Sequence, residues 1–201
     1  MAEKIIKKRQ KNKLHYKRRL FIYVVLPIVF LIVFGWICKK TLVINITNSM
    51  PQGLYKKEAV DKLQIGDLVG VCLDHQKAKL AVEHNILAVN NQCPDGSQML
   101  IKKIIAVPGD RVEITNKHIK VSHCNYHYTY IAPRLKFSAK THQPVLTFID
   151  IGQYHSTGYW LYGKYNTRKS WDSRYFGEVS AENIISKIKP ISILTDKSCE
   201  L

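Results

Sequence analysis

The segment from Leu20 to Cys38, LFIYVVLPIVFLIVFGWIC, contains no charged residue and limits the fold more than any other part of the chain. These nineteen residues, as an α-helix with about 1.5 Å of rise each, would span the roughly 30 Å hydrocarbon core of a bilayer. The segment is longer than the apolar part of a typical cleaved signal peptide, and no small-x-small cleavage pattern follows it. Tyr23 and Trp36 lie toward its ends, where aromatic residues meet the membrane interface, and a membrane helix tolerates Pro27. The sequence therefore predicts one uncleaved transmembrane anchor, rather than a buried core helix.

The charges on either side orient this anchor. Residues 1–19 hold nine lysines and arginines and one acid, Glu3, whereas only Lys39 and Lys40 close the span. The positive-inside rule then places the N-terminus in the cytoplasm and residues 41–201 on the far side. Binding to anionic headgroups accounts for a basic tail at this place, within a chain of net charge +16. A nucleic-acid partner is not expected, because the tail has no interleaved aromatic residues beyond Tyr16.

The part beyond the anchor has the patterns of short strands. Segments rich in β-branched or aromatic residues and bounded by turn residues are expected to be strands: 67–73, 99–107, 110–114, 118–122, 158–163 and 191–195. Residues 181–189 fit a short helix or a last strand. The polar segments 74–98 and 123–157 are expected to be irregular insertions. No βαβ alternation occurs, which excludes a nucleotide-binding parallel sheet and favours a compact antiparallel β domain.

The five cysteines are Cys38, Cys72, Cys93, Cys124 and Cys199. Their odd number and the absence of CxxC spacing argue against a zinc site. One disulfide can form on an oxidising face. The pair Cys93–Cys124 is favoured because both residues lie in polar, loop-like sequence, but the sequence leaves the pairing open.

Two adjacent lysines interrupt an otherwise apolar strand in LIKKIIAVPGD. Successive strand residues face opposite sides, so Lys102 and Lys103 cannot reach the same partner. Apolar neighbours flank both, and a lysine held against an apolar surface has its pKa lowered from about 10.4 by desolvation. A neutral lysine can then serve as the general base for a serine, in a Ser-Lys dyad. The alternative is an edge-strand lysine that extends its amine to solvent.

Ser49, in TNSMPQGLY, is a candidate for that serine. Taken alone, the stretch indicates a turn, because Pro51 restricts Met50 to extended geometry and Gly53 lets the chain reverse. The linker from Cys38 holds Ser49 within about 40 Å of the bilayer, at about 3.3 Å per residue. A nucleophile at that height suits a substrate anchored in the same membrane.

Three stretches in this order, TNSMPQGLY, LIKKIIAVPGDRVEI and SWDSRYFGEV, resemble the nucleophile, general-base and C-terminal boxes of the S26 family of membrane-bound signal peptidases. The resemblance covers most of residues 40–190 and includes the position of the anchor. It implies a signal-peptidase-like, mostly β fold. It also implies a role for each matching residue: Ser49 as nucleophile, Lys102 as general base, Thr47 as oxyanion donor with the Ser49 N–H, Ser170 as the residue that orients the lysine, Asp172 and Arg174 as a structural pair, and Gly53, Gly109 and Asp110 as scaffold.

The segment before the C-terminal box differs from that of the bacterial leader peptidases and indicates which branch of the family the chain resembles. Bacterial leader peptidases carry a Gly-Asp-Asn-Arg element before the last box. This chain has GKYNTRKSWDSR there, with Lys164 at the position of the aspartate and one extra residue of spacing. The motifs SMPxGLY and WDSRYFG are more similar to those of the TraF-type peptidases of conjugative transfer systems, which process pilin precursors. Residues 164–168 are therefore not carried over as site residues.

The resemblance implies a serine endopeptidase without metal or organic cofactor that removes signal peptides or propeptides from a membrane-bound, pilin-like precursor. The expected parts are a basic cytoplasmic tail (1–19), the anchor (20–38) and a periplasmic peptidase domain (39–201) on the inner membrane of a bacterium. A general leader peptidase is the alternative within the class, and a non-catalytic tethered component of a transfer apparatus is the alternative outside it. Whether water or an amine resolves the acyl-enzyme stays open, as do the substrate's identity and the oligomeric state.

Overall fold

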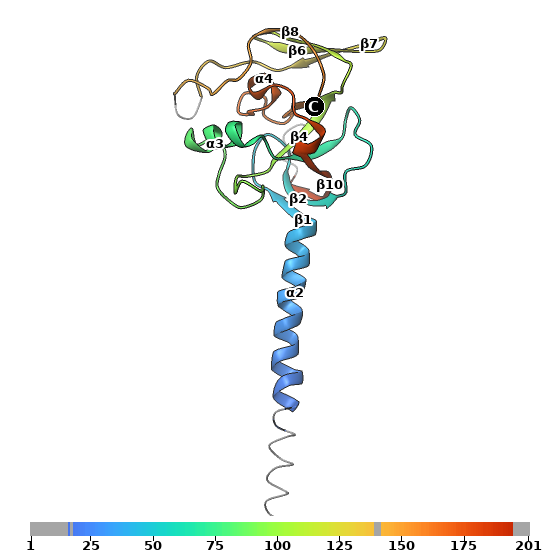
Figure 1. The fold of residues 1–201 in the computed structure, drawn as a ribbon, viewed down its shortest axis with the longest axis vertical. Coiled ribbons are helices and arrows are strands. Elements are labelled where there is room, and N and C mark those ends of the chain that lie inside the picture. The colour runs from blue at the N-terminus through green and yellow to red at the C-terminus, as the bar shows by residue number, and fades with distance from the viewer. Residues whose placement is uncertain (1–15, 17, 139–141, 195–201) are drawn as a thin grey trace, which may run out of the picture. The chain divides into compact units, whose positions relative to one another are not determined.

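The computed structural model describes residues 16, 18–138 and 142–194, and the chain divides into two compact units, Met1–Leu42 and Val43–Leu201. The first unit is helical, with η1 (Phe21–Val25) continuing into α2 (Leu26–Thr41) (Figure 1). The continuous helix Arg18–Thr41 has 24 residues and is long and apolar enough to cross a membrane. Pro27 lies inside this helix, directly after the π-helical turn η1, in which Leu26 N donates to Phe21 O, and a membrane helix tolerates a proline at such a local irregularity. The expected anchor lies within this helix, and most of the expected basic tail lies outside the described residues.

The second unit contains two antiparallel sheets, which confirms the mostly β prediction. The six-stranded sheet has the order β1-β2-β10-β3-β4-β9, and the four-stranded sheet has the order β7-β6-β5-β8. The strands are β1 (Leu42–Asn45), β2 (Gln52–Glu58), β3 (Leu68–Val71), β4 (Leu100–Ala106), β5 (Arg111–Ile114), β6 (His118–His123), β7 (Tyr126–Ile131), β8 (Gly152–His155), β9 (Trp160–Tyr162) and β10 (Ile184–Leu194). The short helices are α3 (His75–Glu83), α4 (Ser173–Phe176) and η2 (Ala181–Asn183).

Two strand edges in the larger sheet have no partner strand among the described residues. β1 is an edge strand, and the loop with the candidate nucleophile follows directly after it. β4 lies between β3 and β9, but β9 pairs with β4 only from Lys103 to Ala106. The first three residues of β4, which end at Lys102, therefore have no strand partner on that side.

The alternation of side chains along the strands builds a separate apolar cluster on each side of β4 and β9. One cluster joins the larger sheet to α3 and α4: Val69, Val71, Ile104, Leu161, Trp171, Tyr175 and Phe176 are among its members. The other joins it to the smaller sheet: Ile105, Ala106, Val112, Ile114, Ile119, Val121, Trp160 and Tyr162 belong to it. Burial of these side chains, at about 25 cal/mol per Å² of apolar surface, stabilises the two sheets against each other. β4 is thus held rigidly from both sides.

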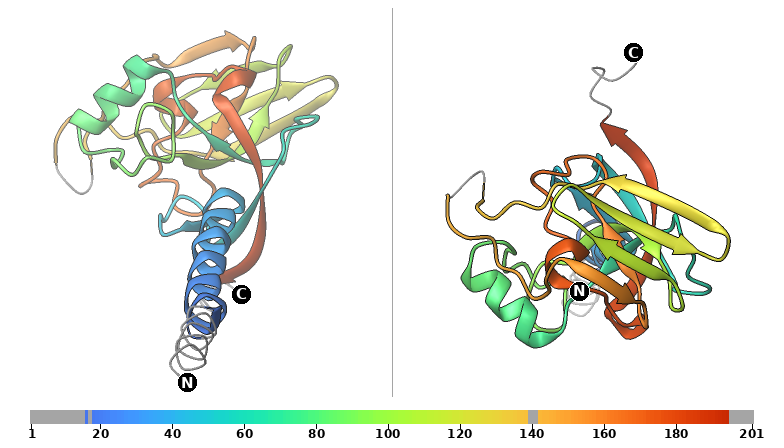
Figure 2. Two further views of the ribbon diagram at one scale, coloured as in Figure 1. Left: turned by 60° about the horizontal axis from the view of Figure 1, so that its bottom comes forward. Right: turned by 90° about the horizontal axis from the view of Figure 1, so that it is seen from above.

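The expectation of irregular structure in two segments was wrong in part. Residues 74–98 include α3, which begins where the Asp74 side chain accepts a hydrogen bond from Lys77 N. Residues 123–157 include β7 and β8, which extend the smaller sheet at its two edges. The polar composition was misleading because β7 is largely exposed and α3 buries only Ala78 and Ala81. In Figure 2, α3 and β7 lie on opposite sides of the unit.

The favoured disulfide pairing was also wrong. The disulfide joins Cys72 and Cys93, whose Cα atoms are 5.6 Å apart, while Cys124 is exposed and unpaired. Cys72 follows β3, and Cys93 returns to it from the loop after α3. The bond therefore ties that loop to the larger sheet, a juxtaposition that only the fold creates. Cys199 lies outside the described residues.

The expected strands 67–73, 99–107, 110–114, 118–122 and 158–163 are confirmed, with bounds that shift by at most two residues, and the expected strand 191–195 is the end of the longer β10. β5 and β6 form the hairpin around Asn116 and Lys117, with Arg111 opposite Ser122. Residues 181–189 contain both alternatives, because η2 leads directly into β10. Thr195, the last residue of the expected strand 191–195, lies outside the described residues.

Candidate active site

Ser49 lies in the turn between β1 and β2, at the mouth of a pocket of about 810 Å³. Its side-chain oxygen is 3.2 Å from Thr47 Oγ1, and its carbonyl accepts a hydrogen bond of 3.2 Å from Tyr165 N. Among the hydrogen bonds of the described residues, none uses the Ser49 N–H. That N–H is therefore free to donate to an oxyanion beside Ser49, and the Thr47 hydroxyl, which donates to Asn45 Oδ1 at 2.7 Å, lies next to it.

Lys102 extends from β4 into the same pocket. Its side chain is only 2% exposed, and its amine donates a hydrogen bond of 3.1 Å to Ser170 Oγ. Burial lowers the pKa of Lys102 from 10.5 to about 8, Asp172 opposes that shift, and Arg174 adds to it. A substantial fraction of this amine is therefore neutral in mildly alkaline solution.

The strand alternation separates Lys102 from Lys103. Lys102 is buried and faces the pocket, whereas Lys103 is partly exposed and lies opposite Leu68 and Tyr162 in the ladder. The general-base candidate is thus the lysine that the family register selects. No hydrogen bond joins Lys102 to Ser49 directly among the described side chains; catalytic contacts are often looser without substrate than with it.

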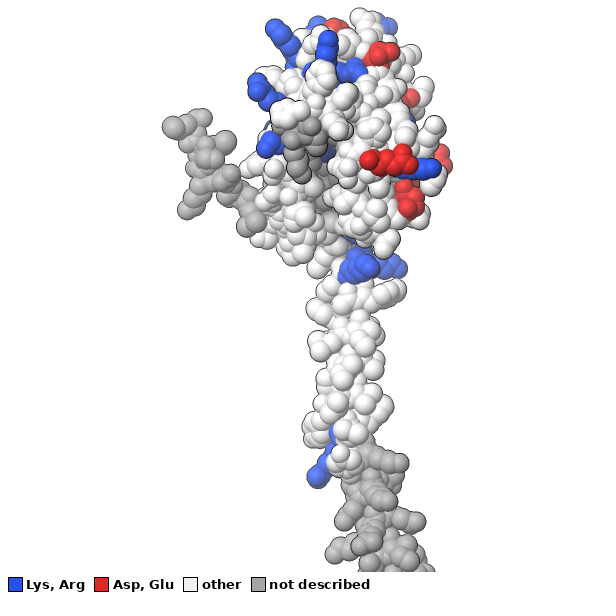
Figure 3. All heavy atoms as spheres, turned by 90° about the vertical axis from the view of Figure 1, so that its left-hand side faces the viewer, with Lys and Arg blue, Asp and Glu red and all other residues white. Residues whose placement is uncertain are grey.

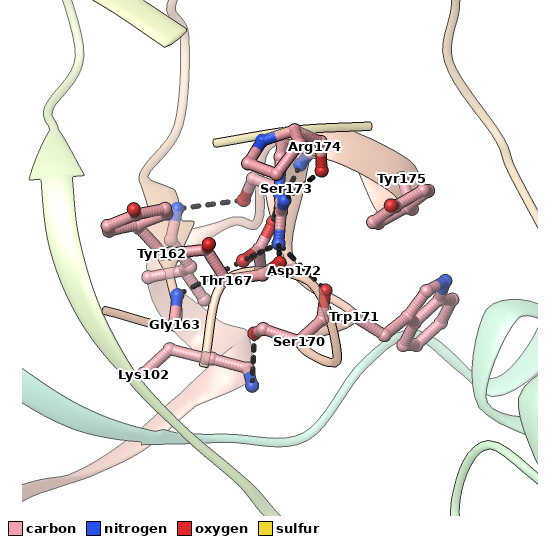
Figure 4. Close-up of polar contacts among 12 residues, drawn as sticks. Lys102, Tyr162, Gly163, Thr167, Ser170, Trp171, Asp172, Ser173, Arg174 and Tyr175 are labelled. Carbon is pink, nitrogen blue, oxygen red and sulfur yellow. Dashed lines mark hydrogen bonds and ion pairs between the residues drawn. The ribbon is translucent and has the colours of Figure 1, made fainter. Parts of the chain in front are cut away.

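Ser170, Asp172 and Arg174 form a buried network next to Lys102 (Figure 4). The Asp172 carboxylate accepts hydrogen bonds from Arg174 Nε at 2.7 Å and Arg174 Nη2 at 2.9 Å. Arg174 also donates to the carbonyls of Ser170, Thr167 and Pro133 at 2.8, 2.8 and 2.6 Å. Burial would lower the pKa of Arg174, but the ion pair with Asp172 outweighs burial and raises it. Arg174 fixes the backbone that presents Ser170, and Asp172 compensates its buried charge.

Gly163 is a site residue that the sequence did not single out. Asp172 accepts a hydrogen bond of 3.1 Å from its N–H. A Cβ at this position would lie 1.9 Å from Ser170 Oγ and 3.2 Å from Ser49 Cβ, so only glycine fits. The absence of a side chain at Gly163 lets Ser170 and Ser49 both pack against its backbone. Ser170, in turn, accepts the hydrogen bond from Lys102. The only sequence signal for Gly163 is its position before Lys164, at the start of the divergent element.

Asn45 also escaped the sequence interpretation. It is the last residue of β1, is buried, and its side-chain amide contacts the turn that carries Ser49. A lone asparagine before a turn has no distinguishing pattern. The structure shows that the Asn45 amide makes five hydrogen bonds.

The pocket is lined by polar and apolar surface from several parts of the unit. β1 and the first half of β4 contribute walls, as do the loop after α3 and the segments around residues 143–146 and 168–171. No aspartate or glutamate is among its described lining residues, whereas Arg168 and Lys169 are. On the face drawn in Figure 3, basic side chains gather toward the upper left of the unit and most visible acids toward the right.

The arrangement is suited to acyl transfer. It brings together Ser49, Thr47, Lys102 and Ser170 at one pocket and places Asp172 and Arg174 directly behind it. Among the described residues no group of three or more His, Cys, Asp or Glu side chains could hold a metal ion. Lys164 is exposed at the surface.

A family model and several relatives match this chain. The family model described as signal peptidase, peptidase S26, matches residues 15–193. The conjugal transfer protein TraF of Agrobacterium fabrum is 28% identical over 158 residues, which cover 74% of this chain and 80% of the relative. A probable conjugal transfer protein TraF of Sinorhizobium fredii is 31% identical over 144 residues, which cover 71% of this chain and 72% of the relative.

Proposed function

Since the chain belongs to the S26 signal peptidase family, we propose that it is a membrane-anchored serine endopeptidase that uses a Ser49–Lys102 dyad to process exported precursors during conjugative transfer. The observation that carries the proposal is the buried Lys102 amine, with its pKa lowered to about 8, in the pocket that also contains Ser49. A lysine this buried destabilises the fold at neutral pH. A non-catalytic scaffold has no need of it.

In the proposed reaction, neutral Lys102 accepts the proton of Ser49 as Ser49 Oγ attacks the scissile carbonyl. Ser170 orients the amine through its hydrogen bond. The Ser49 N–H and the Thr47 hydroxyl donate to the oxyanion, and each such donor contributes about 2.7–4 kcal/mol in comparable sites. Protonated Lys102 then donates to the leaving amine. The acyl-enzyme is resolved when a nucleophile attacks the ester carbonyl and Lys102 takes up that nucleophile's proton. Lys102 then returns this proton to Ser49 Oγ as the ester C–O bond breaks, which restores the resting site.

The unpaired edges of β1 and of the first half of β4 border the pocket and offer backbone groups to an extended peptide. A peptide bound as an added strand would have its scissile carbonyl fixed by main-chain hydrogen bonds. The helix Arg18–Thr41 anchors the peptidase in the membrane that also holds its substrate. We infer a cytoplasmic N-terminus, a periplasmic active site in the bacterial inner membrane and a pilin-like precursor as substrate. The excess of basic residues before the helix and the TraF relatives support this assignment.

The test is cleavage of a membrane precursor by purified protein in proteoliposomes. The probe is a single-span precursor with an Ala-x-Ala site beside its membrane segment, because the resemblance to signal peptidases implies small residues before the cleaved bond. Ser49→Ala and Lys102→Ala should abolish cleavage while the proteins stay folded. Lys103→Ala is the matched control and should keep most of the activity. Thr47→Ala should lose about 10²–10³ in rate, as other oxyanion donors do.

A second assay separates the specialised role from a general one. A methylene in a binding pocket discriminates by only about 1–3 kcal/mol, so strict selectivity must come from docking within the membrane. A soluble peptide spanning the site should therefore be a poor substrate compared with the embedded precursor. Expression in cells depleted of their own leader peptidase should not restore growth. Rescue, with broad processing of exported proteins, would instead identify a general leader peptidase.

A further inference from the structure

The side chain of Asn45 lies under the turn that presents Ser49. It is only 5% exposed, although asparagine is a polar residue that is seldom buried without a full set of partners. The position is four residues before Ser49, at the point where β1 ends and the turn begins.

The Asn45 amide nitrogen faces three backbone carbonyls of the turn. It donates to Thr47 O at 3.2 Å, Met50 O at 3.0 Å and Pro51 O at 2.9 Å. The amide has two hydrogens, so one of them is shared between two of these acceptors. One side chain thereby connects the carbonyl two residues before the nucleophile with the carbonyls of the two residues that follow it.

The Asn45 amide oxygen faces two donors of Thr47. It accepts from Thr47 N at 3.1 Å and from Thr47 Oγ1 at 2.7 Å. Donors surround the oxygen and carbonyls surround the nitrogen, so the opposite assignment of the amide would leave all five contacts unfavourable. The orientation of the amide is therefore determined by its surroundings.

Thr47 has one hydroxyl proton and two neighbours that could receive it. Asn45 Oδ1 lies at 2.7 Å and Ser49 Oγ at 3.2 Å. The closer oxygen holds the proton in the resting site, and the Thr47 oxygen can then accept from the Ser49 hydroxyl. When an oxyanion forms beside Ser49, its full negative charge competes with the neutral amide for the proton, and a rotation of the hydroxyl delivers it.

Two carbonyls of the turn also accept hydrogen bonds from residues outside it. Tyr55 Oη donates to Pro51 O at 2.5 Å, and Tyr165 N donates to Ser49 O at 3.2 Å. The carbonyls are thus held by Asn45 and by two elements packed around the turn, whereas the Ser49 N–H is left without a partner among the described residues.

We propose that Asn45 is a positioning residue for both oxyanion donors. Its amide nitrogen fixes the turn that orients the Ser49 N–H. Its amide oxygen orients Thr47 and accepts the hydroxyl proton until an oxyanion forms. The proposal rests on the peptidase activity proposed above. Asn45 acts through Thr47 and the turn and does not itself contact the substrate's reacting atoms.

The test uses the full chain in proteoliposomes with the same Ala-x-Ala precursor, and it measures kcat and KM. Asn45→Asp is nearly isosteric but presents a second acceptor oxygen to the three carbonyls, and Asn45→Ala removes all five hydrogen bonds. Both should lower kcat by about 10²-fold or more with a small change in KM, since an oxyanion donor acts in the transition state. Asn48→Ala removes the exposed asparagine next to Ser49, whose side chain accepts a hydrogen bond from Gln52 and makes none to the turn carbonyls among the described residues, and should keep its kcat.

A double-mutant cycle distinguishes positioning from a general structural role. Thr47→Val removes the hydroxyl that Asn45 is inferred to hold. If Asn45 acts through Thr47, the loss of kcat in the Asn45→Ala/Thr47→Val variant will be well below the product of the two single losses. If the loss of kcat in the double variant equals the product of the two single losses, the link to Thr47 is wrong. A native kcat in folded Asn45→Asp would overturn the proposal as a whole. Should a variant melt below the assay temperature, Asn45→Ser, which keeps an acceptor for Thr47 N, takes its place in the cycle.

A second readout does not require activity. Amide hydrogen exchange across residues 46–51 should accelerate in Asn45→Ala and stay unchanged in Asn48→Ala, because only the first loses the contacts that hold the turn. An unchanged exchange rate in Asn45→Ala would refute the positioning role. If the wild-type chain cleaves no precursor but this acceleration is found, the proposed peptidase activity falls and the role of Asn45 in shaping the turn stands.

Discussion

Replacing Lys102 by methionine should make the protein more stable while removing its activity. The pKa of Lys102 falls from 10.5 in an exposed lysine to about 8 in the folded site, mainly because burial disfavours the charged amine. Each pKa unit corresponds to about 1.36 kcal/mol, so the charged form is penalised by about 3 kcal/mol on folding. Methionine has a similar length, carries no charge and fills the same buried position.

The pH dependence follows from proton linkage. Between pH 8 and 10.5 the unfolded chain binds more protons at this residue than the folded protein does, so the wild-type stability rises with pH across that window. Below pH 8 the full penalty applies, and above 10.5 it is gone. Loss of the hydrogen bond to Ser170 subtracts about 1 kcal/mol from the gain. Lys102→Met should therefore be about 2 kcal/mol more stable than wild type near neutral pH, and the difference should shrink toward about pH 10.

The assay is chemical unfolding of the full chain in detergent micelles, followed by near-ultraviolet circular dichroism at several pH values. Lys103→Met controls for the removal of a lysine from β4. A Lys102→Met variant that is less stable than wild type at neutral pH would refute the reasoning. A gain that is equal at all pH values would also refute it, because burial of the methionine alone would then explain the result.

Three further predictions concern the scaffold and the topology. Gly163→Ala should lower kcat by about 10²-fold or more in the precursor assay, because the new methyl group displaces the Ser170 hydroxyl that orients Lys102; unchanged kcat would contradict the close packing. Breaking the Cys72–Cys93 disulfide in C72S/C93S should lower the free energy of unfolding by about 3 kcal/mol, given the separation of 21 residues; a stability equal to wild type would show that the bond constrains nothing. Protease added to the periplasmic side of spheroplasts should digest the β unit and leave an epitope on the basic tail intact, and tail cleavage from that side would reverse the inferred topology.

The motifs predicted which side chains lie together better than they predicted the segments around them. Ser170 is 68 residues from Lys102 in the chain, yet the structure brings the two side chains to hydrogen-bond distance. The register of β4 was readable because adjacent lysines in a strand must face opposite sides, and burial then selects Lys102. Chemistry-bearing residues of this kind leave a local pattern in the sequence.

Features that depend on packing left no such pattern. Gly163 matters because two serines approach it, and Asn45 matters because five backbone or hydroxyl groups converge on its amide. The disulfide joins Cys93 to Cys72 because the loop after α3 folds back onto β3, although Cys72 looked like part of a buried strand. The disulfide depends on long-range arrangement and the contacts of Asn45 depend on the exact conformation of a turn, and composition and periodicity encode neither.

The measurement that tests the central claim most directly is the pH profile of kcat/KM for precursor cleavage. If Lys102 is the general base, only its neutral form accepts the proton of Ser49, so kcat/KM should rise with an apparent pKa near 8 in the free enzyme. The profile should keep this pKa in Lys103→Ala, because the other lysine lies outside the pocket. A profile that is flat from about pH 6 to about pH 10, or cleavage that survives in Lys102→Ala, would contradict the Ser49–Lys102 dyad.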